Sequence, residues 1–175
     1  MENAASQEPE PPFFAIGLWK LGLLGAATFG LYQLAWFVLH WRHIRDTQDK
    51  RLSPVIRGIW FPFVYVFPLA YRFGKVARSR AVGSPVVTLL LATLWLVLGL
   101  GVLVSRAPMP VALLPLVPVA ALQAVANRAN RSVNPGHNPN VRLTAGNWVL
   151  VAVGGLLLLL VILASAVPPQ PPGVQ

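Results

Sequence analysis

The sequence predicts an all-α fold, a polytopic membrane helix bundle with four spanning helices and one short re-entrant or interfacial segment. Four uncharged windows of 19 residues or more separate the charged parts of the chain, and about 20 apolar residues suffice to cross a bilayer as a helix. Twelve of the fourteen Lys and Arg residues fall in three short stretches between these windows. Hydrophobic residues make up 55% of the chain and charged residues 11%, against about 25% charged in an ordinary soluble domain.

The elements follow from these windows. Within a single transmembrane domain of residues 13–166, the spans are expected at about residues 20–40, 83–104, 109–127 and 147–166. Residues 1–12 form an acidic tail that lacks the basic region of a cleavable signal peptide, so we expect a disordered tail followed by an uncleaved first span. Residues 167–175 contain four prolines and little apolar surface, which predicts a second tail without a packed structure.

The remaining window, residues 58–71, has 14 residues, too few to cross comfortably, and it contains Pro62 and Pro68. If it crossed, the basic groups before and after it would lie on opposite sides of the membrane, which the positive-inside rule disfavours. We therefore expect residues 54–71 to re-enter or lie at the interface, with both basic groups cytoplasmic and both termini outside. Lys20 and Arg106 are left at span ends, where long side chains can reach headgroups. The residues expected to contact anionic lipid headgroups are Arg42, Arg45, Arg51, Arg72, Lys75, Arg78, Arg80, Arg128 and Arg131.

Small residues recur at every fourth position in the first expected span. Gly22, Ala26 and Gly30 would form a smooth stripe on one face of a continuous helix, and such stripes let a second helix approach closely. We predict a helix-packing face here, with its partner either in this chain or in another protein. The alternative is that Gly and Ala are simply common in membrane helices.

Two histidines and an aspartate share one helix face near the end of that span. His40, His43 and Asp46 have the spacing of possible metal ligands, and His137 could add a fourth. A solvent-facing helix end offers no second shell of hydrogen bonds, so we expect a polar helix end and no metal site. No cofactor site is expected either, since the aromatic residues around Trp60 resemble an ordinary interfacial belt.

Polar residues also recur toward the end of the third expected span. Asn127 and Asn130 alternate with Arg128 and Arg131, and this face is expected either to be solvated or to bind a lipid phosphate or a neighbouring loop. Earlier in the same segment, Pro115 and Pro118 each remove one backbone hydrogen bond and predict a kink.

Several chemistries are disfavoured by composition. The chain has no cysteine, and none of its five acidic residues lies in an expected span. Ion-coupled transporters normally use intramembrane carboxylates, and hydrolases need an acid or histidine beside a nucleophile. We therefore expect no catalytic residues and no enzyme activity. The net charge of +9 is explained by anionic lipid without invoking nucleic acid.

Two groups of motifs resemble a family of small bacterial integral membrane proteins. The first is Thr28-Phe29-Gly30-Leu31-Tyr32 with Trp36-Phe37, Trp41, Ile44, Leu52-Ser53-Pro54 and Arg57, and the second is Ala126-Asn127-Arg128 with Asn130, Pro135-Gly136-His137 and Asn147-Trp148. His40 departs from the resemblance, which would place Asn there. The resemblance implies a multi-pass protein of the bacterial inner membrane and supplies no activity.

The function hypothesis that follows is a non-enzymatic accessory or scaffold component that packs against another membrane protein or against anionic lipid. The alternative is a small channel or transporter without intramembrane carboxylates, with Pro115 and Pro118 as its flexible point. A membrane enzyme is a third class, and Asp46 or Asp49 would have to carry its chemistry. Oligomeric state and partner identity are left open by the sequence.

Overall fold

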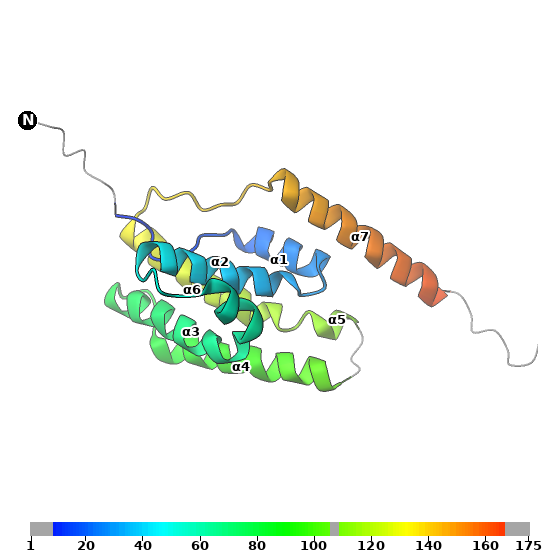
Figure 1. Cartoon of the computed structure of the whole chain (residues 1–175), viewed down its shortest axis with the longest axis horizontal. Coiled ribbons are helices and arrows are strands. Elements are labelled where there is room, and N and C mark those ends of the chain that lie inside the picture. The colour runs from blue at the N-terminus through cyan, green and yellow to red at the C-terminus, as the bar shows by residue number, and fades with distance from the viewer. Residues whose placement is uncertain (1–8, 106–108, 167–175) are drawn as a thin grey trace, which may run out of the picture.

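The computed structural model describes residues 9–105 and 109–166, and within them every regular element is helical (Figure 1). The predicted C-terminal tail, residues 1–8 of the predicted N-terminal tail and Arg106 lie outside the described residues. The elements are α1 (Leu18–Ala27), α2 (Tyr32–Thr47), a short π-helical turn η1 (Ile56–Trp60), α3 (Pro62–Ser79), α4 (Pro85–Val104), α5 (Met109–Ala112), α6 (Leu116–Val133) and α7 (Ala145–Ala166). The all-α class predicted from the sequence is confirmed.

One described helix, α4, is both long and apolar enough to cross a membrane, since it has 20 residues and contains no charged residue. At 1.5 Å per residue it is about 30 Å long, the thickness of the hydrocarbon core. α1, with 10 residues, is about half that length. Of the four spans predicted from the sequence, α4 therefore meets this requirement among the described residues, and the number of four spans is not confirmed.

The first expected span, residues 20–40, is not one helix, and this corrects the sequence-based expectation. α1 ends at Ala27 because Phe29 and Gly30 adopt positive φ values of 53° and 89°, which no α-helix accommodates. Thr28 stabilises the turn on both sides, since its Oγ1 donates to Leu24 O at 2.7 Å and accepts from Tyr32 N at 2.9 Å. Gly30 is suited to this position because glycine carries no Cβ to oppose a left-handed backbone.

The turn makes α1 and α2 a hairpin that returns to its starting side (Figure 1). His43 Nε2 lies 2.7 Å from the carbonyl oxygen of Pro11, and Gln48 Nε2 donates to Pro12 O at 3.3 Å. The segment before α1 and the end of α2 are therefore neighbours. The expectation that the first span separates the N-terminal segment from the basic end of α2 is overturned by these contacts.

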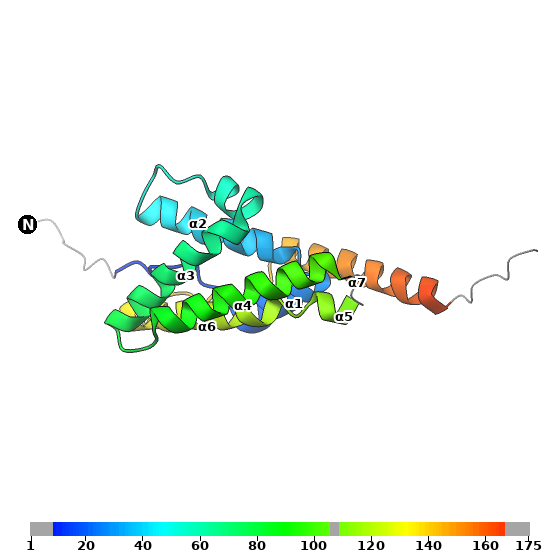
Figure 2. The same ribbon diagram turned by 90° about the horizontal axis from the view of Figure 1, so that it is seen from below.

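The segment from η1 to α3 lies against the same hairpin. η1 packs on α2 so closely that a Cβ on Gly58 would lie 2.6 Å from Val38 N. α3 begins at Pro62, where a proline costs no hydrogen bond, and it continues through Pro68 to Ser79. It then turns into α4, and the two helices approach at Gly74, where an added Cβ would lie 2.7 Å from Pro85 N. Figure 2 shows α3 and α4 side by side, with both meeting at the turn.

The kink predicted from the prolines is present as a break. α5 ends at Ala112 and α6 begins at Leu116, because Pro115 has no N–H and fixes its own φ near −60°. Pro118 is accommodated in the first turn of α6, where the backbone N–H groups have no helical partner in any case. α6 then runs without interruption to Val133, so the helix continues beyond residue 127, the end of the expected span.

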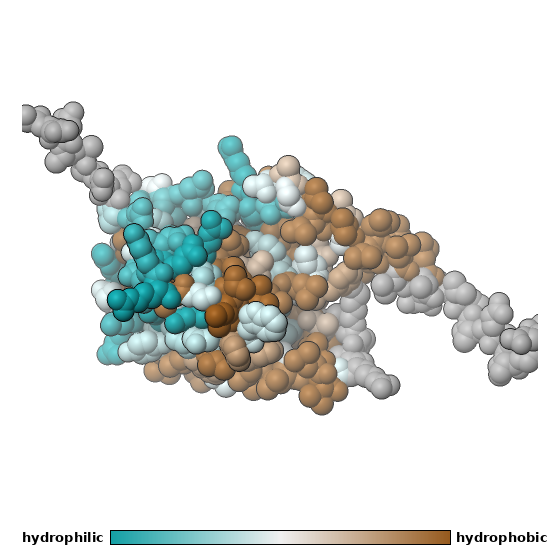
Figure 3. Space-filling view, in the orientation of Figure 1, coloured by the Kyte–Doolittle hydropathy of each residue, from teal (hydrophilic) through white to brown (hydrophobic). Residues whose placement is uncertain are grey.

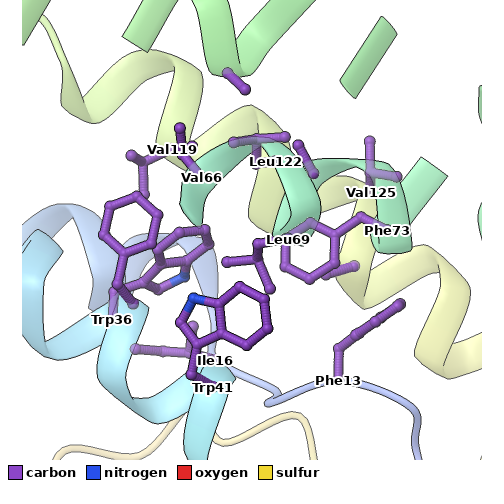
Figure 4. Close-up of a cluster of buried hydrophobic side chains, with 14 of the residues drawn as sticks. Phe13, Ile16, Trp36, Trp41, Val66, Leu69, Phe73, Val119, Leu122 and Val125 are labelled. Atoms are coloured by element: carbon purple, nitrogen blue, oxygen red, sulfur yellow. The ribbon is translucent and has the colours of Figure 1, made fainter. Parts of the chain in front are cut away.

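Aromatic side chains fill the centre of the bundle, between α2, α3 and α6 (Figure 4). Trp36, Trp41 and Phe73 are all fully buried, and Phe13 from the segment before α1 packs edge-on against Phe73 with ring centroids 4.6 Å apart. Edge-to-face pairs of this kind add about 0.5–1.5 kcal/mol to the burial of the rings. The N-terminal segment is thus part of the core.

α7 lies along one edge of the bundle, beside α1 (Figure 1). The two helices touch at Gly154, where an added Cβ would lie 2.6 Å from the carbonyl carbon of Ala27. Beyond this contact the described side chains of α7 are exposed, among them the five leucines of residues 156–160.

The surface is divided along the long axis of the molecule (Figure 3). Hydrophilic residues gather at the end where α2, α3 and α6 finish, and hydrophobic residues cover the end reached by α4 and α7 (Figures 1 and 3). The basic groups that the sequence assigns to one side of a membrane therefore lie at one end of the fold.

Candidate membrane-surface site

The basic residues predicted to contact lipid headgroups are accessible. Seven of the nine are exposed, and Arg45 and Arg72 are half-buried. Two ion pairs are present among the described residues, Arg42 with Asp46 at 3.8 Å and Arg45 with Asp46 at 2.8 Å. Both pairs lie in solvent and neutralise little of the charge, so this end of the molecule is strongly positive.

Two arginines connect the helices at this end of the molecule. Arg72 Nη1 donates to Gln48 Oε1 at 3.0 Å and so joins α3 to the end of α2. The guanidinium of Arg57 lies 4.8 Å from the ring centroid of Trp41 and 4.7 Å from that of Tyr65, within the range of cation–π attraction. The basic loops of residues 48–57 and the start of α3 are held by these contacts.

A buried polar network centred on Gln123 of α6 lies behind this surface. Its Oε1 accepts from Trp36 Nε1 at 2.6 Å and lies 2.9 Å from His40 Nε2. Its Nε2 donates to Phe14 O at 3.2 Å and to Asn127 Oδ1 at 2.8 Å. One fully buried amide therefore joins α6 to α2 and to the segment before α1.

This network fixes the tautomer of His40. The Gln123 oxygen must face the Trp36 N–H, because the amide NH₂ group in its place would put two donors together. His40 Nε2 must then carry a hydrogen and donate to that oxygen. Its Nδ1 is left as an acceptor with no hydrogen-bond partner among the described residues, and the ring is held edge-on by Trp36 at 4.5 Å between centroids.

Two further amides of α6 hold the extended segment of residues 11–17. Asn130 pairs with the backbone of Phe13 in both directions, donating to its O at 2.8 Å and accepting from its N at 3.1 Å. Asn127 Nδ2 donates to Ile16 O at 2.8 Å. Gln123, Asn127 and Asn130 lie on one face of α6 and satisfy backbone groups that would otherwise be buried without partners. Of the polar residues predicted to be solvated or to bind a lipid phosphate or a neighbouring loop, Asn127 and Asn130 thus bind the N-terminal segment.

The connection between α6 and α7 also holds the segment before α1. Asn140 Nδ2 donates to Ala15 O at 3.0 Å, and Lys20 Nζ donates to Asn140 Oδ1 at 2.9 Å and to Arg142 O at 2.8 Å. Lys20 is only 3% exposed. The expectation that its side chain reaches headgroups is corrected, because its ammonium is instead committed to two acceptors inside the fold.

The predicted small-residue stripe is split by the turn after α1. Gly22 and Ala26 are exposed on α1, whereas Gly30 lies beyond the end of the helix and does not continue their row. An added Cβ on Gly22 would meet nothing within 4 Å. Close packing of α1 occurs instead at Gly25, where an added Cβ would lie 2.5 Å from Leu116 Cδ2. That Gly22 and Ala26 pack against another molecule stays a prediction.

The residues considered as metal ligands face different partners. His40 bonds Gln123, His43 bonds Pro11, and Asp46 pairs with two arginines. His137 Nδ1 bonds Asn134 O at 2.7 Å in the connection after α6. Within the described part of the chain, no three His, Cys, Asp or Glu residues come together as a metal site.

Sequence reasoning missed two buried glutamines that organise the interior. Gln123 is described above, and Gln33 Oε1 accepts from Trp95 Nε1 at 2.7 Å and so fixes α4 to α2. A signal was available, because each glutamine lies within an uncharged and largely apolar window. Polar residues inside membrane helices usually find a partner in another helix.

None of the family models, curated proteins or solved structures with which the chain was compared matches it. The family resemblance drawn from the sequence motifs therefore stays an expectation.

Proposed function

We propose that this chain is a multi-pass protein of the bacterial inner membrane that acts as a non-enzymatic accessory or scaffold component, packing against anionic lipid or another membrane protein. The observation that carries the proposal is the coexistence, on one small molecule, of a broad exposed apolar surface with a compact basic end. A soluble monomer rarely exposes a contiguous apolar patch beyond a few hundred Å². A bilayer stabilises both surfaces at once.

α4 and α7 supply most of the apolar surface. On α4, Leu103 is 70% exposed and Val104 is 86% exposed, and on α7 Val149 is 61% exposed. The polar atoms of α4 are directed inward or bonded to its own backbone, as with Thr88, which is buried and donates to Pro85 O at 3.0 Å. These features suit helices that face hydrocarbon.

The proposed topology places the basic ends of α2, α3 and α6 on the cytoplasmic side, following the positive-inside rule. α4, α6 with α5, and α7 cross the membrane, and the α1–α2 hairpin and η1 dip into it and return. The segment before α1 is then cytoplasmic, since it is hydrogen-bonded to the end of α2.

Single cysteines in this naturally cysteine-free chain test the topology directly. We expect Ser79→Cys and Ser53→Cys, both near the basic end, to resist an impermeant thiol reagent applied to intact cells. Glu10→Cys should resist it too, whereas Ser105→Cys, at the far end of α4, should react. Labelling of Glu10→Cys would restore the single first span expected from the sequence.

The scaffold role is tested by purifying the tagged chain from its native membrane in mild detergent and identifying what remains bound. A membrane protein recovered in near-equal amount supports an accessory subunit. Recovery of the chain alone, with no lipid and no partner, would contradict the proposed role. Release of the chain by an alkaline wash without detergent would contradict membrane integration itself.

A further inference from the structure

A groove of about 660 Å³ opens on the surface where α1 begins, beside the last turns of α6 and the connection that follows. It is called the α6 groove here, and its lining includes Leu18, Trp19, Ala124, Arg128, Arg131 and His137. Its volume is within the range of small-molecule sites, which is about 300–1,000 Å³.

The polar side of the α6 groove is cationic. Arg128 and Arg131 are three residues apart on α6 and so project from the same face. Both are exposed, and neither forms an ion pair with an acid among the described residues. Arg128 uses its Nε on the carbonyl of Ala124 at 3.3 Å, which leaves its terminal nitrogens for another acceptor.

His137 adds a third nitrogen to this side. The carbonyl oxygen of Asn134 can only accept, so the 2.7 Å contact means that His137 Nδ1 carries a hydrogen and donates it. No hydrogen bond to its Nε2 is present among the described residues. The groove thus offers two guanidinium groups and an imidazole, which suit the oxygens of a phosphate.

The opposite side of the α6 groove is apolar and exposed. Trp19 is 54% exposed and Leu18 is 44% exposed, although both lie in the first turn of α1. Tryptophan at such a position is typical of the membrane–water interface, because the ring combines an apolar body with one N–H donor.

We propose that the α6 groove binds the headgroup of one anionic phospholipid, with its phosphate at Arg128 and Arg131 and the start of its acyl chains against Leu18 and Trp19. This inference rests on the proposed membrane location and adds a defined site to it. Charge complementarity favours an anionic phosphate, and the exposed apolar wall favours a lipid over a free phosphate ion.

The test uses the full chain in detergent micelles, with phosphatidylglycerol as the anionic probe and native mass spectrometry to count retained lipids. We expect wild type to retain one phosphatidylglycerol in preference to phosphatidylcholine. The double variant Arg128→Gln/Arg131→Gln should bind it roughly thirtyfold more weakly, given about 1 kcal/mol for each basic residue near an anionic lipid. The matched control is Lys50→Gln/Arg142→Gln, which removes two exposed positive charges that neither line the α6 groove nor belong to the predicted headgroup contacts, and it should bind as wild type does.

Each outcome separates the site from the broader proposal. Equal weakening by both double variants would overturn the α6 groove as a site while leaving general attraction to anionic membranes intact. Retention of phosphatidylcholine as strong as that of phosphatidylglycerol would overturn an anionic lipid as the ligand. Displacement of phosphatidylglycerol by millimolar inorganic phosphate, at a fixed lipid concentration, would do the same. An unchanged melting temperature of the lipid-free Arg128→Gln/Arg131→Gln variant excludes misfolding as the cause of weaker binding. Trp19→Gln, which keeps both arginines, should reduce retention of the lipid but not of inorganic phosphate.

Discussion

Replacing Gln123 with leucine is the change that most directly tests the buried hydrogen-bond network of the interior. Leucine has a similar volume, so no large cavity forms, but it neither donates nor accepts hydrogen bonds. Trp36 Nε1 and His40 Nε2 would each lose their acceptor, at 2.6 Å and 2.9 Å in the native structure. Phe14 O and Asn127 Oδ1 would lose a donor.

The expected cost follows from these groups. A buried donor left without a partner costs about 1–3 kcal/mol. The two donors here, the Trp36 indole N–H and the His40 imidazole N–H, together cost about 2–6 kcal/mol. The two acceptors add less, since a carbonyl tolerates a missing partner better than an N–H does. The total is a large fraction of the stability of an ordinary domain, which is about 5–15 kcal/mol.

The measurement is thermal unfolding of the purified chain in detergent, followed by tryptophan fluorescence. Gln48→Leu is the matched control, because Gln48 is exposed and its bonds to Arg72 and Pro12 are made in solvent. It should cost less than about 1 kcal/mol.

A double-mutant cycle with Trp36→Phe isolates one of the bonds. Removing the indole donor removes one unpaired group, so Gln123→Leu should cost less in the Trp36→Phe background than in wild type. Strictly additive effects, or a Gln123→Leu variant as stable as Gln48→Leu, would refute the hydrogen-bonded network described here.

Two glycine predictions concern helix packing. Gly154→Ala should destabilise the fold by about 1–3 kcal/mol, because its Cβ would collide with the backbone of Ala27, whereas Gly155→Ala, which meets nothing within 4 Å, should be neutral or stabilising. Gly74→Ala should likewise loosen the α3–α4 contact and lower the melting temperature, and Gly101→Ala, also without a neighbour within 4 Å, is its control. Equal melting temperatures within either pair, measured in detergent, would show that these backbone contacts are looser than described.

The sequence determined the local features of this protein, and the break near Pro115 illustrates why. Proline lacks an N–H and fixes φ wherever it occurs, so its effect on a helix can be read without knowing any neighbour. The helical class and the alternation of basic stretches with uncharged windows are equally local. Each depends on composition and periodicity along one stretch of chain.

The turn at residues 28–31 was not predicted, because Gly30, the residue that allows it, also fits a helix-packing role when only the sequence is considered. Gly30 was interpreted as part of a packing stripe, which is reasonable for glycine in an apolar helix. The structure uses its freedom at positive φ to reverse the chain, together with a threonine that bonds both flanking helices. A glycine is compatible with either role, so only the surrounding structure decides between them.

The polar residues of α6 show the same division. The spacing of Asn127 and Asn130 identified one helix face from the sequence alone, because helical periodicity fixes which residues share a face. What that face binds was decided by the tertiary structure, which places the backbone of residues 13–16 against it. These partners are more than 100 residues apart, and pairing over such a distance depends on how the whole bundle packs, which no local pattern encodes.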